Sequence, residues 1–214
     1  MGKLQVALDL IDLDDALKLV QELQEWVDII EVGTPFLIEN GLKAVSLLKE
    51  SCPDKEILCD GKIMDAGLYE ASSMFRAGAD WVTVMACTDE ATIRECVQAA
   101  KQANGRVMAD LLTVTNMAQR VAILESAQVD CAAVHTGVDQ QHLGKTPLSD
   151  LRELRQCSQN IQVAVAGGIS ASTVKEYMTL SPDILIVGGG ILSQADPVAA
   201  ARAIRAAMHT HEKE

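Results

Sequence analysis

The most constraining feature of this chain is an eightfold repeat of a short apolar run, a polar or glycine turn, and a longer amphipathic stretch. The runs are too short for helices of normal length. Their continuous apolar character is typical of parallel strands that are covered on both faces. They lie at Leu4–Leu8, Ile29–Val32, Ile57–Cys59, Trp81–Met85, Arg106–Ala109, Cys131–Val134, Gln162–Ala166 and Ile184–Val187.

The stretches between these runs carry the signals that begin and end helices. Acidic or amide side chains that can cap the first turn precede several of them, and Asn104-Gly105 provides a left-handed stop. The helix starts that we predict are Asp12 or Asp14 (through about Glu25), Asp89, Asn116, Ser172 (capping Thr173–Leu180) and Asp196-Pro197.

Eight strands, each followed by a helix, in 214 residues give roughly 27 residues per unit, which fits a small (β/α)8 TIM barrel of the α/β class. An open doubly wound sheet is the alternative, but it usually has five or six strands and leaves two units unexplained. No linker or shift of composition divides the chain. We therefore predict a single barrel domain over residues 1–214, with a frayed tail at 208–214.

Charge and composition exclude several classes of partner. The net charge of −12 repels nucleic acids and acidic membranes, and no basic run offsets it. No apolar segment is long enough to span a bilayer, and the N-terminus does not resemble a signal peptide. The six cysteines contain no Cys-x-x-Cys pair and are too sparse for a disulfide scaffold. We expect a cytoplasmic protein with reduced thiols.

Ionisable residues stand at the ends of most of the predicted strands. Because active sites of (β/α)8 barrels lie beyond the carboxyl ends of the strands, we expect these side chains to meet at one mouth of the barrel. Several buried charges in one place need a cation or a network of ion pairs. The residues are Asp9, Glu31, Asp60, Lys62, Asp65, Asp110 and His135.

Four of these residues suggest particular chemistry. Glu31 and Asp60, on neighbouring strands, provide hard oxygen ligands suited to Mg²⁺. Lys62 shares the parity of Asp60 and, close to carboxylates, stays protonated, so that it can neutralise a developing oxyanion. His135 ends the sixth run and can exchange a proton near neutral pH. A surface salt-bridge cluster and a structural histidine are the plain alternatives.

Glycines follow the last two strands. Gly167-Gly168 comes after the seventh strand and Gly188-Gly189-Gly190 after the eighth. Phosphate sites of this architecture are commonly built from these two loops, where backbone N–H groups approach the anion. We predict a phosphate site with Gly167, Gly168, Gly188 and Gly189. Tight turns without a ligand are the alternative.

Several motifs together resemble a known family. Asp60-x-Lys62-x-x-Asp65, preceded by Val27-Asp-Ile-Ile-Glu-Val-Gly-Thr34 and followed by Val134-His-Thr-Gly-Val-Asp139, resembles the 3-hexulose-6-phosphate synthase family of the orotidine 5′-monophosphate decarboxylase suprafamily. The likeness extends from Leu4-Gln-Val-Ala-Leu-Asp9 to Ala195–Ala201, which is nearly the whole chain.

The resemblance implies a homodimeric lyase that uses Mg²⁺ and a 1,2-enediolate. It would condense D-ribulose 5-phosphate with formaldehyde, reversibly, to D-arabino-hex-3-ulose 6-phosphate. It implies that Asp65 enters the partner's site and that Asp9 contacts substrate hydroxyls. By the same resemblance, Glu31 and Asp60 are metal ligands, and Lys62, His135, Asp60 and Asp65 are catalytic. Asp110 is assigned to substrate binding without a defined role.

Two rival functions stay open. The 3-keto-L-gulonate 6-phosphate decarboxylase family shares the Asp-x-Lys-x-x-Asp motif. After the sixth strand, however, that family carries a run like His-Arg-Ser-Arg-Asp, whereas this chain has His135-Thr-Gly-Val-Asp139. That family also carries an Arg at the position of Gly189. Both differences favour the synthase family. A barrel that binds sugar phosphates without catalysis is the second rival, although every expected catalytic residue type is present.

Overall fold

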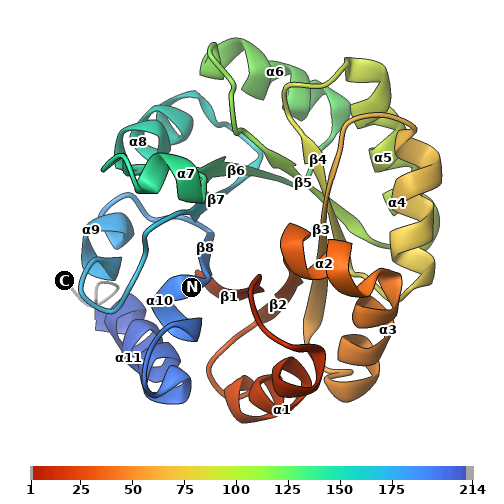
Figure 1. Cartoon of the computed structure of the whole chain (residues 1–214). Coiled ribbons are helices and arrows are strands. Elements are labelled where there is room, and N and C mark those ends of the chain that lie inside the picture. The colour runs from red at the N-terminus through yellow and green to blue at the C-terminus, as the bar shows by residue number, and fades with distance from the viewer. Residues whose placement is uncertain (1, 211–214) are drawn as a thin grey trace.

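The eight predicted strands form one closed parallel barrel. A computed structural model describes residues 2–210. Each strand pairs with the next along the chain, and β8 closes the barrel by pairing with β1. Figure 1 shows the ring of strands with the helices outside it. The strands are β1 (Lys3–Leu8), β2 (Ile29–Val32), β3 (Glu56–Ile63), β4 (Trp81–Met85), β5 (Arg106–Asp110), β6 (Cys131–His135), β7 (Gln162–Ala166) and β8 (Ile184–Val187).

The barrel confirms the predicted fold class and excludes the open sheet for the described residues. Four strands have the predicted bounds, whereas β3, β5 and β6 extend further into the polar residues that follow their apolar runs. The longest extension is in β3, which continues four residues beyond Cys59 to Ile63. Asp60, Lys62, Asp110 and His135 are therefore strand residues rather than loop residues.

The helices cover the outside of the barrel. They are α1 (Leu13–Leu23), α2 (Thr34–Asn40), α3 (Leu42–Ser51), α4 (Gly67–Arg76), α5 (Glu90–Ala103), α6 (Met117–Ala127), α7 (Val138–Gln141), α8 (Leu148–Cys157), α9 (Val174–Met178), α10 (Gly189–Leu192) and α11 (Pro197–Thr210). Two helices, α2 and α3, follow β2, and short helices lie in the loops after β6 and β8. The pattern of one helix per strand is thus too simple.

Most of the predicted helix ends are found. Asp12 caps α1 by accepting the N–H of Asp14, and Asn116 caps α6 by accepting the N–H of Gln119. Asn104 ends α5 in the left-handed conformation. The prediction at Ser172 is wrong, because α9 begins at Val174 and its first turn has no side-chain cap. The N–H of Val174 is instead bonded to the backbone oxygen of Ser170.

The C-terminal helix is longer than predicted. The frayed tail expected from residue 208 is contradicted at its start, because α11 continues to Thr210 and Met208 is buried. Residues 211–214 of that prediction lie outside the described residues. No helix in the described part of the chain is long and apolar enough to cross a membrane.

Two apolar clusters hold the barrel together. The larger one lies between the strands and the helices, and the smaller one fills the inside of the barrel with side chains such as Ile29, Leu58, Trp81 and Met108. Alternation along each strand sends successive side chains to these two clusters. The same alternation continues to the strand ends, where it points polar side chains into the mouth.

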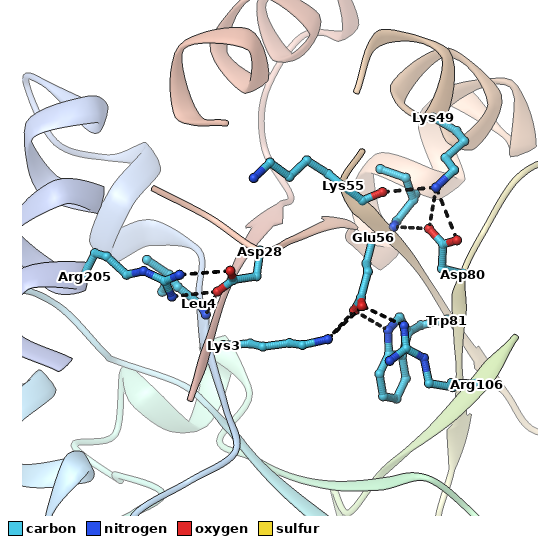
Figure 2. Close-up of polar contacts among 11 residues, drawn as sticks. Lys3, Leu4, Asp28, Lys49, Lys55, Glu56, Asp80, Trp81, Arg106 and Arg205 are labelled. Atoms are coloured by element: carbon cyan, nitrogen blue, oxygen red, sulfur yellow. Dashed lines mark hydrogen bonds and ion pairs between the residues drawn. The ribbon is translucent and has the colours of Figure 1, made fainter. Parts of the chain in front are cut away.

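The amino end of the barrel is closed by ion pairs (Figure 2). Lys3 and Arg106 converge on Glu56, at 2.7 and 2.8 Å, and the indole of Trp81 donates to the same carboxylate at 2.9 Å. Burial alone would raise the pKa of Glu56, but these three donors outweigh it and lower the pKa to about 2. These ion pairs therefore stabilise the amino end of the barrel, and the predicted site residues lie at the opposite end.

Candidate active site

The carboxyl ends of the strands bring the predicted side chains together. Asp60 and Asp110 are buried, and Lys62 lies between them, with its Nζ 2.9 Å from Oδ2 of each. Oδ2 of Asp110 also lies 2.9 Å from Nδ1 of His135. Asp60, Lys62, Asp110 and His135 therefore form a continuous chain of ionisable side chains, the charged chain, which crosses the mouth from β3 through β5 to β6.

Strand β3 is irregular where it enters the site. Its register with β4 shifts between Cys59 and Ile63, and Lys62 has a φ of 44°. This left-handed conformation is uncommon for a residue other than glycine, asparagine or aspartate. The N–H of Lys62 is bonded to the hydroxyl of Thr83 at 2.9 Å. The irregularity directs both Asp60 and Lys62 to the mouth.

Asp110 is held as a strong anion. Burial alone would raise its pKa, but the hydrogen bond with His135 and the charge of Lys62 outweigh burial and lower the pKa to about 2. The N–H of Leu112 donates to its Oδ1 at 2.8 Å. For Lys62, burial works against the charged form, but Asp60 and Asp110 hold the pKa above its ordinary value. Both residues are thus charged at neutral pH.

This anion fixes the chemical form of His135. An ionised carboxylate only accepts hydrogen bonds, so neutral His135 donates from Nδ1 and keeps the lone pair on Nε2. Nε2 is then the atom that can take a proton. The imidazole is partly exposed, with 24% of its side-chain surface accessible. The arrangement is that of a histidine base oriented by a carboxylate.

A second acidic group lies beside this chain. Glu31, on β2, is buried, and its Oε2 accepts the amide of Gln5 at 2.6 Å. Burial, and next the charge of Asp60, raise the pKa of Glu31 well above its usual range. The pKa of Asp9 is also raised, by burial first and by Asp60 second. The mouth therefore holds more carboxyl groups than the single ammonium of Lys62 can compensate if all of them are ionised.

Glu31 and Asp60 fit a hard divalent cation. Their carboxylates are close enough for one to raise the pKa of the other, and a cation between them would remove that repulsion. Within residues 2–210, no group of three or more His, Cys, Asp or Glu side chains is placed to hold a metal ion. Mg²⁺ does not need such a group, because it is usually held by one or two carboxylates together with water and substrate oxygens.

The two glycine loops adjoin each other at the same mouth. Gly167 and Gly168 have φ values of 118° and 65°, which side chains disfavour. A Cβ at Gly190 would collide with the backbone oxygen of Ile169, so the loop after β8 packs directly on the loop after β7. A Cβ at Gly188 would lie 3.3 Å from Oδ2 of Asp9. The two glycine loops and Asp9 thus lie side by side.

Asp65 is the one predicted site residue that stands apart. It is exposed, and its carboxylate accepts the N–H of Ala66 at 2.7 Å. None of the hydrogen bonds among the described residues links it to Asp60, Lys62 or His135. Within one subunit, therefore, Asp65 does not belong to the charged chain.

Three polar residues of the site were not predicted from the sequence. Thr83 donates to Oδ1 of Asp60 at 2.7 Å, Thr34 donates to Oδ2 of Asp60 at 2.8 Å, and Gln5 holds Glu31. Thr83 and Gln5 are single polar residues inside apolar strands, at positions whose parity points into the barrel. That parity was the available signal.

Fold and site together define a (β/α)8-barrel enzyme with an acidic mouth, a carboxylate-oriented histidine and adjoining glycine loops. The family model for the orotidine 5′-phosphate decarboxylase / HUMPS family matches residues 2–204. The chain belongs to this family, and the predictions that it is an enzyme and that it resembles the synthases are confirmed.

Three comparisons describe the chain's similarity to particular relatives. It is 43% identical over 206 residues to a 3-hexulose-6-phosphate synthase of Staphylococcus epidermidis, covering 96% of this chain and 98% of the relative. The crystal structure of 3-hexulose-6-phosphate synthase from Salmonella typhimurium superposes with a TM-score of 0.95 at 47% identity, covering 98% and 99%. A 3-keto-L-gulonate-6-phosphate decarboxylase from Vibrio cholerae gives 0.86 at 28%, covering 98% of each.

Proposed function

We propose that the chain is a carbon–carbon lyase that condenses D-ribulose 5-phosphate with formaldehyde, reversibly, to D-arabino-hex-3-ulose 6-phosphate. Similarity to the named synthases over nearly the whole chain supports this substrate pair. The observation that carries the proposal is the hydrogen bond between His135 Nδ1 and Asp110, which leaves Nε2 of the histidine free as a base.

The substrate is anchored at its phosphate. Backbone N–H groups donate hydrogen bonds to the phosphate oxygens; they belong to Gly167, Gly168, Gly188 and Gly189. Asp9, which borders Gly188, binds hydroxyl groups of the sugar. Such anchoring holds the reacting end in place while binding energy is drawn from the distant phosphate.

His135 then removes the C1 proton of ribulose 5-phosphate. The resulting 1,2-enediolate carries its negative charge on oxygen, where the ammonium of Lys62 stabilises it. The C1 carbon attacks the carbon of formaldehyde, one carbon–carbon bond forms, and the aldehyde oxygen takes the proton back from His135. In the reverse direction the same groups split the hexulose phosphate.

Mg²⁺ is the cofactor in this proposal, with Glu31 and Asp60 as its protein ligands. When bound, it supplies Lewis-acid polarisation of the substrate carbonyl. Gln5 and Thr34 hold the two carboxylates in place through their hydrogen bonds.

The active form in this proposal is a homodimer in which Asp65 enters the partner's site. Two observations support it. Asp65 is exposed and turned to its own backbone, and apolar side chains are exposed on the segments after β1 and β3 and on α2 and α4. These side chains are Leu10 (88% exposed), Ile38 (78%), Met64 (54%) and Tyr69 (76%).

We also propose a cytoplasmic location, since all six cysteines are free.

Decarboxylation of 3-keto-L-gulonate 6-phosphate is the alternative activity, supported by the likeness to the Vibrio cholerae enzyme. Two differences argue against the decarboxylase. The segment after His135 has no arginine, and Gly189 stands where that family carries an arginine.

A parallel assay separates these functions. The purified protein is given ribulose 5-phosphate with formaldehyde, or 3-keto-L-gulonate 6-phosphate, each with Mg²⁺ and with excess chelator. We expect faster turnover of the first pair and its loss on chelation. Faster turnover of the second substrate would favour the decarboxylase, and turnover of neither would favour a binding protein.

A second experiment tests the base. His135→Ala should abolish exchange of the C1 proton of ribulose 5-phosphate with deuterated water, measured by NMR, while leaving phosphate binding nearly intact. His142→Ala is the matched control, because His142 is exposed and lies outside the charged chain. Undiminished exchange in the His135 variant would remove this residue from the role.

A further inference from the structure

Thr83 is a polar residue enclosed by the barrel. It lies at the centre of β4, its residue is 4% exposed, and its register partner on β5 is Met108. Its hydroxyl has one proton to donate and oxygen lone pairs to accept with. The proton goes to Oδ1 of Asp60 at 2.7 Å, and the oxygen accepts the N–H of Lys62 at 2.9 Å. One hydroxyl thus binds two residues of the active site.

The contact to Lys62 is made where the chain is least regular. The pairing of β3 with β4 shifts register between Cys59 and Ile63, and Lys62 has a φ of 44°. A residue in this conformation persists only when its surroundings hold it there. The hydrogen bond to Thr83 ties the N–H of Lys62 to β4 at this irregularity, and the Nζ of the same residue reaches Asp60 and Asp110.

The contact to Asp60 sets the direction of its carboxylate. Thr83 holds Oδ1, while Thr34 and the ammonium of Lys62 hold Oδ2 at 2.8 and 2.9 Å. With both oxygens engaged, the plane of the carboxylate is fixed. Without Thr83, Oδ1 loses its hydroxyl donor and Asp60 retains only the contacts on the other side.

We propose that Thr83 is a positioning residue that sets the geometry of Asp60 and Lys62 together through its single hydroxyl. The proposal rests on the proposed function, in which Asp60 holds Mg²⁺ and Lys62 stabilises the enediolate. Thr83 touches neither substrate nor metal in this account. It acts by holding a strained lysine and a metal-binding carboxylate in one relative arrangement.

Three variants test this role. Thr83→Val keeps the branched shape and removes the hydroxyl, whereas Thr83→Ser keeps the hydroxyl. Met108→Leu is the matched control, because it alters the buried neighbour of Thr83 without touching either hydrogen bond. Should Thr83→Val fail to fold, Thr83→Cys serves in its place, because a thiol is only a weak donor and acceptor.

Two of the measurements do not depend on turnover. Hydrogen–deuterium exchange reports protection of the Lys62 amide, and electron paramagnetic resonance of Mn²⁺ reports cation affinity. We expect Thr83→Val to lose the amide protection and to bind Mn²⁺ about 10- to 100-fold more weakly, as replacements beside metal ligands typically do. Thr83→Ser and Met108→Leu should stay near wild type in both measurements.

Kinetics provides the third measurement. In Thr83→Val, kcat for condensation should fall about 10- to 100-fold while KM for ribulose 5-phosphate changes little, because the phosphate is bound elsewhere. Thr83→Ser should restore kcat. Wild-type kcat and amide protection in Thr83→Val, or a folded Thr83→Ser as impaired as Thr83→Val, would overturn the proposal. A wild-type protein without condensation activity would refute the proposed function, while exchange and Mn²⁺ affinity would still decide the role of Thr83.

Discussion

Replacing Asp110 by Asn keeps the size of the side chain and removes its charge. In the native site Oδ2 accepts from both Lys62 and His135, and Oδ1 accepts from the N–H of Leu112. An amide has one oxygen, so in either orientation its NH₂ group faces at least one of these donors. If it faces His135 and Lys62, the histidine must accept at Nδ1, and Nε2 carries the proton instead.

The loss of stability can be worked out from the pKa of Asp110. The shift from 3.8 in the unfolded chain to about 2 in the folded protein is worth roughly 2 kcal/mol. Because the folded pKa is the lower one, this stabilisation is fully present above pH 3.8 and is lost as the pH falls through about 2. Asp110→Asn should therefore lower the free energy of unfolding by roughly 2 kcal/mol at pH 7, and the difference should shrink towards pH 2.

The loss of activity follows from the histidine. General base catalysis contributes about 10²- to 10⁴-fold, so C1 proton exchange in Asp110→Asn should slow by at least about 100-fold in deuterated water. Asp130→Asn is the control, because Asp130 also accepts a backbone N–H, from Val107, but precedes β6 at the opposite end of the barrel. Exchange at the wild-type rate in Asp110→Asn would refute the reasoning that this carboxylate orients the base.

Three further predictions concern the rest of the barrel. Glu56→Gln should lower the free energy of unfolding at pH 7 by roughly 1–2 kcal/mol, because solvent screens part of these partly exposed ion pairs; its pKa falls from 4.5 to about 2 on folding, so this stabilisation, present above pH 4.5, should vanish as the pH falls through about 2 in urea titrations. Inactive Lys62→Ala and Asp65→Ala proteins should regain some activity when mixed if sites are shared between subunits; no rescue would mean that each site is built within one chain. Gly167→Ala, at a φ of 118° and against a neighbouring carbonyl, should weaken ribulose 5-phosphate binding about tenfold or more in calorimetry; Gly144→Ala, at a φ of 79° in open space, is the control and should bind normally.

The repeated pattern predicted the barrel because it reports burial directly. Apart from single polar residues such as Gln5 and Thr83, the runs between Leu4 and Val187 are apolar on both faces, as strands between helices and a barrel interior must be. The same logic misplaced the ends of strands. In β3, Asp60 and Lys62 are strand residues whose side chains face a polar mouth, and an apolar run cannot reveal a strand once its surroundings are polar.

The site was predicted as a set of residues but not as a network. Position at the end of an apolar run was enough to predict that Asp60, Lys62, Asp110 and His135 lie close together, and the structure joins them by direct contacts. The central position of Asp110 depends on side-chain geometry between β3 and β6, which spacing does not contain. Asp65 is exposed and accepts only a neighbouring backbone N–H among the hydrogen bonds of the described residues, and a sequence alone cannot say whether a second subunit receives it.

One measurement tests the central claim most directly. Crystals grown with Mn²⁺ and ribulose 5-phosphate would locate the cation by its anomalous scattering and the sugar phosphate by its density. The account predicts the cation between Glu31 and Asp60, the phosphate at Gly167–Gly168 and Gly188–Gly189, and C1 within reach of His135 Nε2. A cation bound elsewhere, or a sugar lying with C1 remote from His135, would contradict it.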